Sequence, residues 1–319
     1  MADKPLERAM NDPFNKDPAV EHGTPVHIAP NVRRITCRNP SAYTFTGTQT
    51  YLVGEGDVAL IDPGPEDAEH LDAVLRALAP DERITDIIVT HSHRDHSPGA
   101  RVLAERTGAP VWAWGAHGAG ITPTMQSLID TGAEIGGGEG GDLSFAPDRI
   151  LADGESVSGP DWTLTALYTP GHLSNHISLA LEGTGIVFTG DLVMGFATTL
   201  VSPPDGDMAA FMASLERLAA RSEDGLYLPG HGHPVEEPHA MLAYQRAHRQ
   251  KRLEQILSAL VDGSKNAATL TREIYTDVDP ALHGAAQRNV LASLIGLYDQ
   301  GQVAADGPIA VDAVFSRSA

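Results

Sequence analysis

A seven-residue run, Thr-His-Ser-His-Arg-Asp-His, begins at position 90 and places three imidazoles and one carboxylate within six positions. It directly follows residues 84–89, whose short, apolar and β-branched character predicts a buried strand. Alternate side chains of an extended backbone point the same way, so His91, His93 and Asp95 share one face, and a turn is needed for His96 to join them. Imidazole and carboxylate groups bind zinc, iron and manganese, so the run predicts a metal site at a strand end, in preference to a polar surface loop.

Three further positions repeat this arrangement later in the chain. His172, Asp191 and His231 each follow a short apolar run and each lie beside a glycine. Glycine lets the backbone turn sharply and approach a site closely. One such residue alone would more often be structural, but three of them after the first cluster predict a shared site.

The order of these motifs resembles that of the metallo-β-lactamase superfamily, over roughly residues 26–238. The resemblance implies an α/β fold, an αββα sandwich, with a two-metal site at one edge. It implies three ligands for a first metal, three for a second, and one bridging carboxylate: His91, His93 and His172; Asp95, His96 and His231; and Asp191. Asp62, in an Ile-Asp-Pro-Gly motif after a strand, matches another motif of the family and would orient the ligand loop.

This site predicts a dinuclear hydrolase that uses two divalent cations. Zinc is the expected metal, and iron and manganese are the alternatives. The two cations would hold a water molecule, lower its pKa and polarise the substrate, so that a metal-bound hydroxide is the nucleophile. Asp95 would also accept the proton of the water. His176 and His233 are alternative proton donors to a leaving group, or else hydrogen-bonded supporting residues.

Three functions remain open from the sequence. The first is hydrolysis of a small-molecule ester, thioester or lactone, as in the glyoxalase II branch. The second is metal-dependent cleavage of RNA, and the third is a mononuclear iron persulfide dioxygenase, which the metal count would distinguish. In the loop after Asp191, Thr198 and Thr199 are either substrate contacts or solvent-facing residues.

Apolar runs and helical periodicity predict the elements around these loops. In the first half we expect strands at 26–37, 43–53, 58–61, 84–89 and 110–114, and helices at 66–79 and 99–106. In the second half we expect strands at 156–158, 163–168, 176–182 and 186–189, and a helix at 208–220. Between them, residues 116–142 hold two glycine clusters, which favour either a flexible surface loop or a lid over the metal site.

The last part of the chain has a different pattern. Helices at 241–260, 270–274 and 279–300, followed by strands at 302–305 and 309–314, predict a winged-helix arrangement. This succession resembles the lactamase-β-2 type of proteins, which include metal-dependent endoribonucleases, and Gly195, Thr198 and Thr199 fit that subgroup too. We therefore expect three parts in the chain: a loose N-terminal arm at 1–25, a sandwich domain at 26–238 and a winged-helix-like domain at 239–319.

The formal net charge of -20 makes the chain a poor partner for nucleic acid and for anionic membranes. The excess lies in residues 1–238, with 14 basic against 34 acidic residues, whereas residues 239–319 hold 8 of each. A neutral winged helix favours packing or a homodimer over DNA binding. The one basic cluster that could guide a short RNA strand consists of Arg246, Arg249, Lys251 and Arg252.

The remaining composition bears on the setting of the protein. The first 25 residues are polar, and no run approaches the ~20 apolar residues of a membrane span. Cys37 is the single cysteine, so no disulfide can form within the chain, and a small buried apolar role is expected for it. We therefore expect a cytoplasmic protein.

Overall fold

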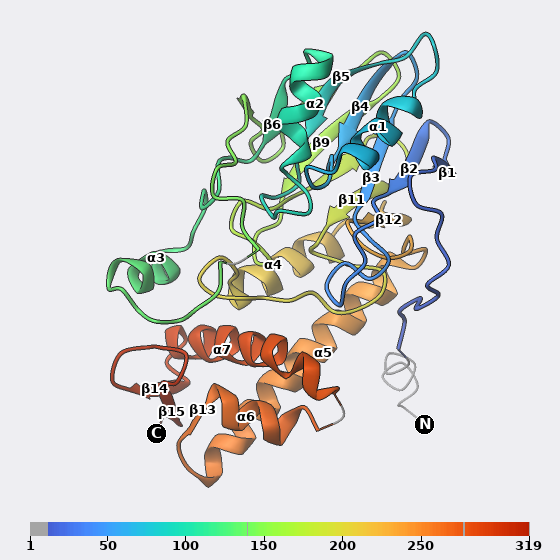
Figure 1. The fold of residues 1–319 in the computed structure, drawn as a ribbon. Helices are drawn as coiled ribbons and strands as arrows, with labels where there is room; N and C mark the ends of the chain where they lie inside the picture. The colour runs from blue at the N-terminus through green and yellow to red at the C-terminus, as the bar shows by residue number, and fades with distance from the viewer. Residues whose placement is uncertain (1–11, 139, 277, 319) are drawn as a thin grey trace, which may run out of the picture.

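The structure is a computed structural model that describes residues 12–138, 140–276 and 278–318. Within these ranges the chain forms two packed sheets with helices on their outer faces, and then a group of helices and short strands (Figure 1). This confirms the αββα sandwich predicted from the sequence. Among the same residues, no helix is both long enough and apolar enough to cross a membrane.

The first sheet contains the strands β1 to β7 in chain order, antiparallel as far as β4 and parallel from β4 onward. Its outer face is covered by α1 (Ala68–Arg76) and α2 (Gly99–Thr107) (Figure 1). The strands are β1 (Val26–Ala29), β2 (Val32–Thr36), β3 (Gln49–Val53), β4 (Asp57–Ile61), β5 (Arg83–Ile88), β6 (Val111–Ala113) and β7 (Arg149–Ile150).

The second sheet has the order β12-β11-β10-β9-β8 within the described residues, and α4 (Met208–Ala219) packs on its outer face. β11 and β12 are parallel, and the other neighbours are antiparallel. The strands are β8 (Ser156–Ser158), β9 (Thr163–Tyr168), β10 (Ile177–Leu181), β11 (Ile186–Gly190) and β12 (Leu226–Pro229).

The period of two along a strand separates the cores of the sandwich. Tyr51 and Val53 of β3 lie in the core between the sheets, whereas Leu52 lies in the core beneath α1 and α2. Ile88 of β5 and Phe188 of β11 enter the same core between the sheets from opposite sides. The apolar strands are therefore buried on both faces, and their loops at one edge are free to carry polar side chains.

Two predicted strands were too long. Residues 26–37 form the hairpin of β1 and β2, because Pro30 and Asn31 turn the chain and Asn31 takes a φ of 56°. Residues 43–53 are a strand only from Gln49, since Gly47 has a φ of 140° and a Cβ there would lie 1.9 Å from the carbonyl oxygen of Cys37. The preceding loop leads into the predicted site.

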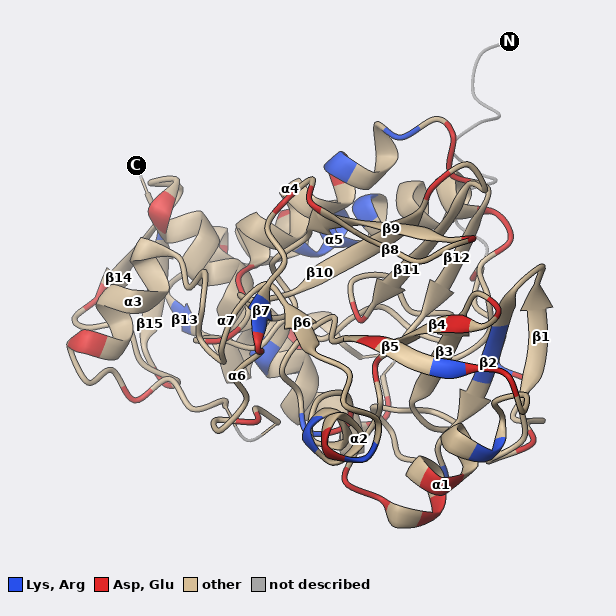
Figure 2. Cartoon of the chain, turned by 90° about the horizontal axis from the view of Figure 1, so that it is seen from above, with Lys and Arg blue, Asp and Glu red and all other residues tan. Residues whose placement is uncertain are grey.

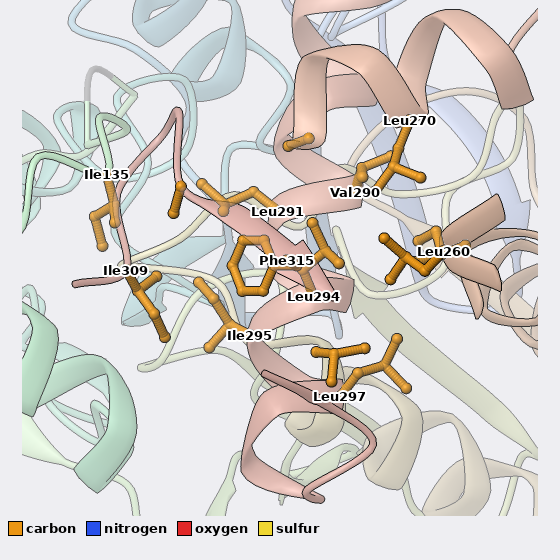
Figure 3. Close-up of a cluster of buried hydrophobic side chains, with 14 of the residues drawn as sticks. Ile135, Leu260, Leu270, Val290, Leu291, Leu294, Ile295, Leu297, Ile309 and Phe315 are labelled. Atoms are coloured by element: carbon orange, nitrogen blue, oxygen red, sulfur yellow. The ribbon is translucent and has the colours of Figure 1, made fainter. Parts of the chain in front are cut away.

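The described residues of the C-terminal region form three α-helices, two 3-10 turns and a small sheet. Its elements are α5 (Pro238–Ala259), a 3-10 turn (Leu260–Asp262), β13 (Lys265–Asn266), α6 (Ala267–Ile274), a 3-10 turn (Pro280–Leu282), α7 (His283–Asp299), β14 (Val303–Asp306) and β15 (Val314–Arg317). Leu270, Val290, Leu294 and Phe315 belong to its shared apolar core (Figure 3). The winged-helix arrangement is confirmed.

The predicted second wing strand at 309–314 was wrong, because β15 begins at Val314 and pairs with β14 from there. Ile309 and Ala313 turn into the apolar core, and the backbone N–H of Val311 donates to the carbonyl of Glu134, 3.0 Å away. The stretch before β15 is thus held by residues 116–142, not by the wing.

Residues 116–142 include a helix, α3 (Pro123–Asp130), that packs on this C-terminal core. Met125, Leu128 and Ile135 are buried there, and Figure 1 shows α3 above the end of α7 that is nearest to β14. A flexible surface loop is therefore the wrong description of this part of the segment. The end of the segment contacts the loop that carries His91 to His96, since the N–H of Arg94 donates to the carbonyl of Gly140 and that of Asp142 to the carbonyl of Ser92. A lid over the metal site therefore stays a prediction.

The described part of the N-terminal arm is not loose, which corrects that expectation for residues 12–25. Phe14 packs edge-on against Tyr244 of α5, with ring centroids 5.6 Å apart. The N–H of Asn15 donates to the carbonyl of Gly195, 3.2 Å away. Residues 1–11 lie outside the described residues, and the domain limits at 25/26 and 238/239 stay predictions.

Candidate metal centre

The predicted ligands come together at one edge of the sandwich, where strands of both sheets end. The loop between β5 and α2 carries His91, His93, Asp95 and His96. The other three ligands, His172, Asp191 and His231, come four, one and two residues after the ends of β9, β11 and β12. The side chains form two groups, in each of which the ligand atoms lie within 4.8 Å of one another: His91, His93, His172 and Asp191; and Asp95, His96 and His231.

In the first group, three ring nitrogens converge on one point. Nδ1 of His93 lies 3.0 Å from Nε2 of His91 and 3.0 Å from Nε2 of His172. Oδ2 of Asp191 lies 3.6 Å from Nε2 of His172 and 4.0 Å from Nε2 of His91. Nδ1 of His93 has one lone pair, so it cannot accept a hydrogen bond from both Nε2 atoms. A cation at this point would instead bind the lone pairs of all three nitrogens.

In the second group, Nε2 of His96 and Nε2 of His231 lie 3.2 Å apart. Oδ2 of Asp95 is 3.1 Å from Nε2 of His231 and 3.5 Å from Nε2 of His96. The second group therefore also directs two ring nitrogens and one carboxylate oxygen at a common point, the donor set of a zinc-like ion.

Asp191 lies between the two groups. Its Oδ1 is 3.5 Å from Nε2 of His96, and its Oδ2 is 3.3 Å from Nε2 of His231 as well as near the first group. Oδ1 is buried and has no hydrogen-bond partner among the described residues. A buried carboxylate oxygen without a partner is costly, so the residues present fit a cation at this position.

The two groups differ in their electrostatics. Burial and the neighbouring imidazoles lower the pKa of His91 well below its ordinary value, and burial with the charge of His172 lowers the pKa of His93 to about 3. Burial disfavours the charged form of His231 too, but Asp191 and Asp95 outweigh it and raise its pKa to about 9. The carboxylates thus favour positive charge in the second group. Either a proton on His231 or a bound metal cation can provide that charge, so the two compete.

Asp62 supports the ligand loop, in the place predicted for it. Its Oδ1 accepts from the N–H of Thr90 at 2.7 Å, and its Oδ2 accepts from the Thr90 hydroxyl at 2.8 Å. Oδ2 also lies 3.0 Å from Nδ1 of His96. If that nitrogen donates to Asp62, Nε2 of His96 keeps its lone pair for a cation. Asp62 itself adopts a φ of 49°, a strained conformation for a non-glycine residue.

The two predicted proton donors are engaged elsewhere. Nε2 of the fully buried His176 accepts from the backbone N–H of Asp191, 3.1 Å away, and its Nδ1 lies 3.0 Å from the Thr169 hydroxyl. Nε2 of His233 lies 2.8 Å from the carbonyl oxygen of Asp17. Both histidines hold backbone, so their alternative interpretation as supporting residues is the one that the contacts favour.

Thr199 is neither a substrate contact nor a solvent-facing residue, which corrects both alternatives for this position. It is fully buried, and its hydroxyl donates to the backbone carbonyl of Asp191, 2.7 Å away. Arg249, placed in the basic cluster that could guide RNA, is only 3% exposed and donates to the carbonyl of Thr199. Cys37 is buried, as expected, and burial raises the pKa of its thiol to about 12.

Several residues of the site were missed because backbone carbonyls, and in one case a hydroxyl, make their contacts. The carbonyl of Gly47 lies 3.3 Å from Nδ1 of His231, and the Thr48 hydroxyl donates to Oδ2 of Asp95 at 3.3 Å. The carbonyl of Leu200 lies 2.8 Å from Nδ1 of His172. Nearby, Phe45 has a φ of 55° and stacks on Phe196, with centroids 5.0 Å apart. A residue type does not reveal which carbonyl faces a ligand.

This fold and these two clusters define a class of protein. The family model of the metallo-beta-lactamase superfamily matches residues 43–231, and that of the beta-lactamase associated winged helix domain matches residues 267–309. The chain belongs to the metallo-β-lactamase superfamily and is a metal-dependent hydrolase of that family.

Particular relatives are similar over most of their length. A "Beta-lactamase-like protein 2 homolog" of Drosophila melanogaster is 31% identical, covering 86% of this chain and 90% of that protein. An "Atrochrysone carboxyl ACP thioesterase" of Aspergillus chevalieri is 27% identical, covering 89% and 87%. A beta-lactamase domain protein from Burkholderia ambifaria has the same fold, with a TM-score of 0.77 at 23% identity over 94% of this chain and 95% of that chain.

Proposed function

We propose that this protein hydrolyses acyl thioesters with two divalent cations, zinc in our proposal, held by its two His and Asp groups. The observation that carries the proposal is Asp191, whose two carboxylate oxygens face both groups and one of which is otherwise without a partner among the described residues. His91, His93 and His172 would hold one cation, and the second would be held by the other group. A cytoplasmic setting and a homodimer stay predictions.

The chain's own residues would divide the work as follows. Bound cations supply Lewis acidity and an activated water. Although burial disfavours its charge, His96 and His231 lower the pKa of Asp95, so its carboxylate is ionised at neutral pH. Because a lowered pKa makes a carboxylate a weaker base, the role of Asp95 as proton acceptor is proposed from its position beside His96 and His231. Asp95 is also the more accessible of the two acids, with 29% of its side chain exposed against 7% for Asp191.

The state of the two candidate proton donors favours a thioester over an ester. His176 and His233 are held by backbone contacts and are not placed to protonate a leaving group. A thiol has an ordinary pKa of about 8.5 and leaves as a thiolate without a proton donor, whereas an alkoxide needs one. The thioesterase name of one relative supports the same substrate class.

The other two functions are supported less well. An RNA strand needs cations to neutralise its phosphates, but Arg249 is buried and the Arg252 guanidinium lies 4.1 Å from the Tyr275 ring centroid inside the C-terminal core region. A mononuclear iron enzyme needs one group of ligands, whereas Asp95, His96 and His231 form a second. We therefore rank both below thioester hydrolysis.

The proposal is tested by metal content and by turnover of acyl pantetheine thioesters beside the matching oxyesters. We expect close to two zinc-like ions per chain and faster turnover of the thioesters. Asp191→Ala should empty both sites and lower kcat/KM by more than about 100-fold, since even residues that only support ligands have effects up to that size. His231→Ala should empty chiefly the second site.

Two exposed residues provide matched controls, Asp81→Ala and His239→Ala, which should retain metal and activity. One iron per chain and no second metal would contradict the dinuclear centre. Equal turnover of thioester and oxyester would contradict the substrate class while leaving the metal centre intact.

A further inference from the structure

The segment 199–201 lies between the metal ligands and the C-terminal helices α5 and α7. On the ligand side, the Thr199 hydroxyl donates to the backbone carbonyl of Asp191 at 2.7 Å. The carbonyl of Leu200 lies 2.8 Å from Nδ1 of His172, and that nitrogen donates to it when Nε2 faces the metal group. Two residues of the segment, Thr199 and Leu200, therefore hold two of the predicted ligands, Asp191 through its backbone and His172 through its ring.

On the opposite side, two side chains from different helices hold the same segment. Nη2 of Arg249, on α5, donates to the carbonyl of Thr199. Oδ1 of Asn289, on α7, accepts from the N–H of Val201 at 2.9 Å and from Nη1 of Arg249 at 3.2 Å. Arg249 and Asn289 are thus joined to each other and to both ends of the segment.

Stability alone does not explain an arginine at position 249. Its side chain is 3% exposed, and its guanidinium lies 5.1 Å from the Phe211 ring centroid. Among the described residues it forms no ion pair with a carboxylate, and its Nε has no hydrogen-bond partner. Burial lowers the pKa of the guanidinium to about 10. A protein with a buried charge that has no counter-ion is usually less stable than one with an apolar side chain of similar volume at that position.

What Arg249 provides, and an apolar side chain would not, is a directed donor. The planar guanidinium donates to the Thr199 carbonyl and to the Asn289 side-chain oxygen at the same time. These two bonds fix the position of the segment 199–201 relative to α5. Arg288 of α7 anchors the same loop further on, by donating to the Ser202 hydroxyl at 2.9 Å and to the carbonyl of Pro203. Within residues 199–201, Asn289 accepts from the N–H of the fully buried Val201, and Arg249 binds the carbonyl of Thr199.

We infer that Arg249 and Asn289 are positioning residues, through which α5 and α7 set the geometry of His172 and Asp191. The C-terminal helices are then part of the metal centre, although they supply none of the seven predicted ligands. The inference rests on the proposed metal site but not on the proposed substrate.

The test compares full-length variants by Zn²⁺ affinity, measured with a competing chelator, and by the visible absorption of the Co²⁺-loaded protein. Asn289→Leu removes the acceptor for both contacts, and Arg249→Lys keeps the charge but loses the planar pair of donors. We expect both to weaken Zn²⁺ binding by roughly 10- to 100-fold and to change the Co²⁺ spectrum. Asn289→Asp keeps Oδ1 as an acceptor, so this variant should have the Zn²⁺ affinity and the Co²⁺ spectrum of the wild-type protein.

Arg252→Met is the control for a general loss of packing. Arg252 lies one turn further along α5, donates to the carbonyl of Ile274 and stacks on Tyr275. This variant should lower Tm without changing Zn²⁺ affinity or the Co²⁺ spectrum. Thr199→Val, which removes only the hydroxyl that binds Asp191, should reproduce the spectral change even if Asn289→Leu fails to fold.

Wild-type affinity and spectrum in folded Arg249→Lys and Thr199→Val would overturn the inference, as would an equal loss in Arg252→Met. If the wild-type chain itself binds no Zn²⁺, the proposed metal function fails, and this is distinguishable because the variants then show no difference to measure against it.

Discussion

At the scale of single residues, Asp62 shows how one carboxylate links the sheet to the metal ligands. It follows β4 of the first sheet, and it binds the N–H and the hydroxyl of Thr90 and faces Nδ1 of His96. Its φ of 49° places the carboxylate beneath the ligand loop at a cost in backbone strain. A strained residue persists where surrounding contacts hold it, and here all three contacts serve the ligand loop.

We predict that Asp62→Asn weakens the second metal site by roughly 10- to 100-fold and the first site much less. Asparagine keeps the shape, but its amide group cannot accept hydrogen bonds from Thr90 and His96 at every position where the carboxylate does. Stepwise titration of the metal-free protein with Zn²⁺ measures both sites. Equal weakening of the two sites, or no weakening, would show that Asp62 does not act through His96.

At the scale of elements, the sequence predicted those whose own residues specify them. β11 is buried throughout and β5 ends in the buried pair Ile87 and Ile88, so the ends of both strands, and with them His91 and Asp191, could be located from the sequence. The wing strand was misplaced because Val311 hydrogen-bonds Glu134, which is remote in the chain. The carbonyls of Gly47 and Leu200 were missed for the same reason: their role depends on where other segments place them, not on residue type.

The helix α3 is another element whose position depends on remote contacts. Met125 is 2% exposed and belongs to the core formed by α6, α7 and β15. We predict that Met125→Ala lowers the free energy of unfolding by about 3 kcal/mol, the usual cost of a cavity at a buried methionine. Urea denaturation measures the change.

Gln126→Ala, at the exposed neighbouring position, is the control and should change the free energy of unfolding by less than about 0.5 kcal/mol. If the two variants are equally stable, α3 is not docked on the C-terminal core in solution. A lid that moves as a whole would then become the better description of residues 116–142.

At the scale of the whole molecule, charge distribution separates the two substrate classes. Residues 1–238 hold 20 more acidic than basic residues, and residues 239–319 add no net charge. Figure 2 shows the acidic positions spread over helices and loops, with basic positions scattered between them. The field over most of the surface therefore repels a polyanion, and the cations of the site act only locally.

The predicted basic cluster does not reverse this field. Arg249 is buried against the segment 199–201, and Arg246 lies 3.4 Å from the carboxylate of Glu216. Lys251 is the exposed member, and one lysine cannot follow a strand of phosphates. Any RNA bound at the metals would therefore be held at a single phosphate.

We predict that cleavage of single-stranded RNA is weak and falls steeply between low and near-physiological salt, while turnover of a neutral acyl thioester changes little. Salt weakens RNA binding because counterions replace the few cationic contacts, whereas a neutral substrate releases none. Rates for both substrates at the two salt concentrations provide the measurement, with Lys251→Glu as the probe of the surface cation. Replacing Arg249 would not test RNA binding, because Arg249 is buried and its contacts hold the segment 199–201 beside the metal ligands. RNA cleavage that stays efficient at physiological salt and is lost in Lys251→Glu would place the nuclease above the thioesterase.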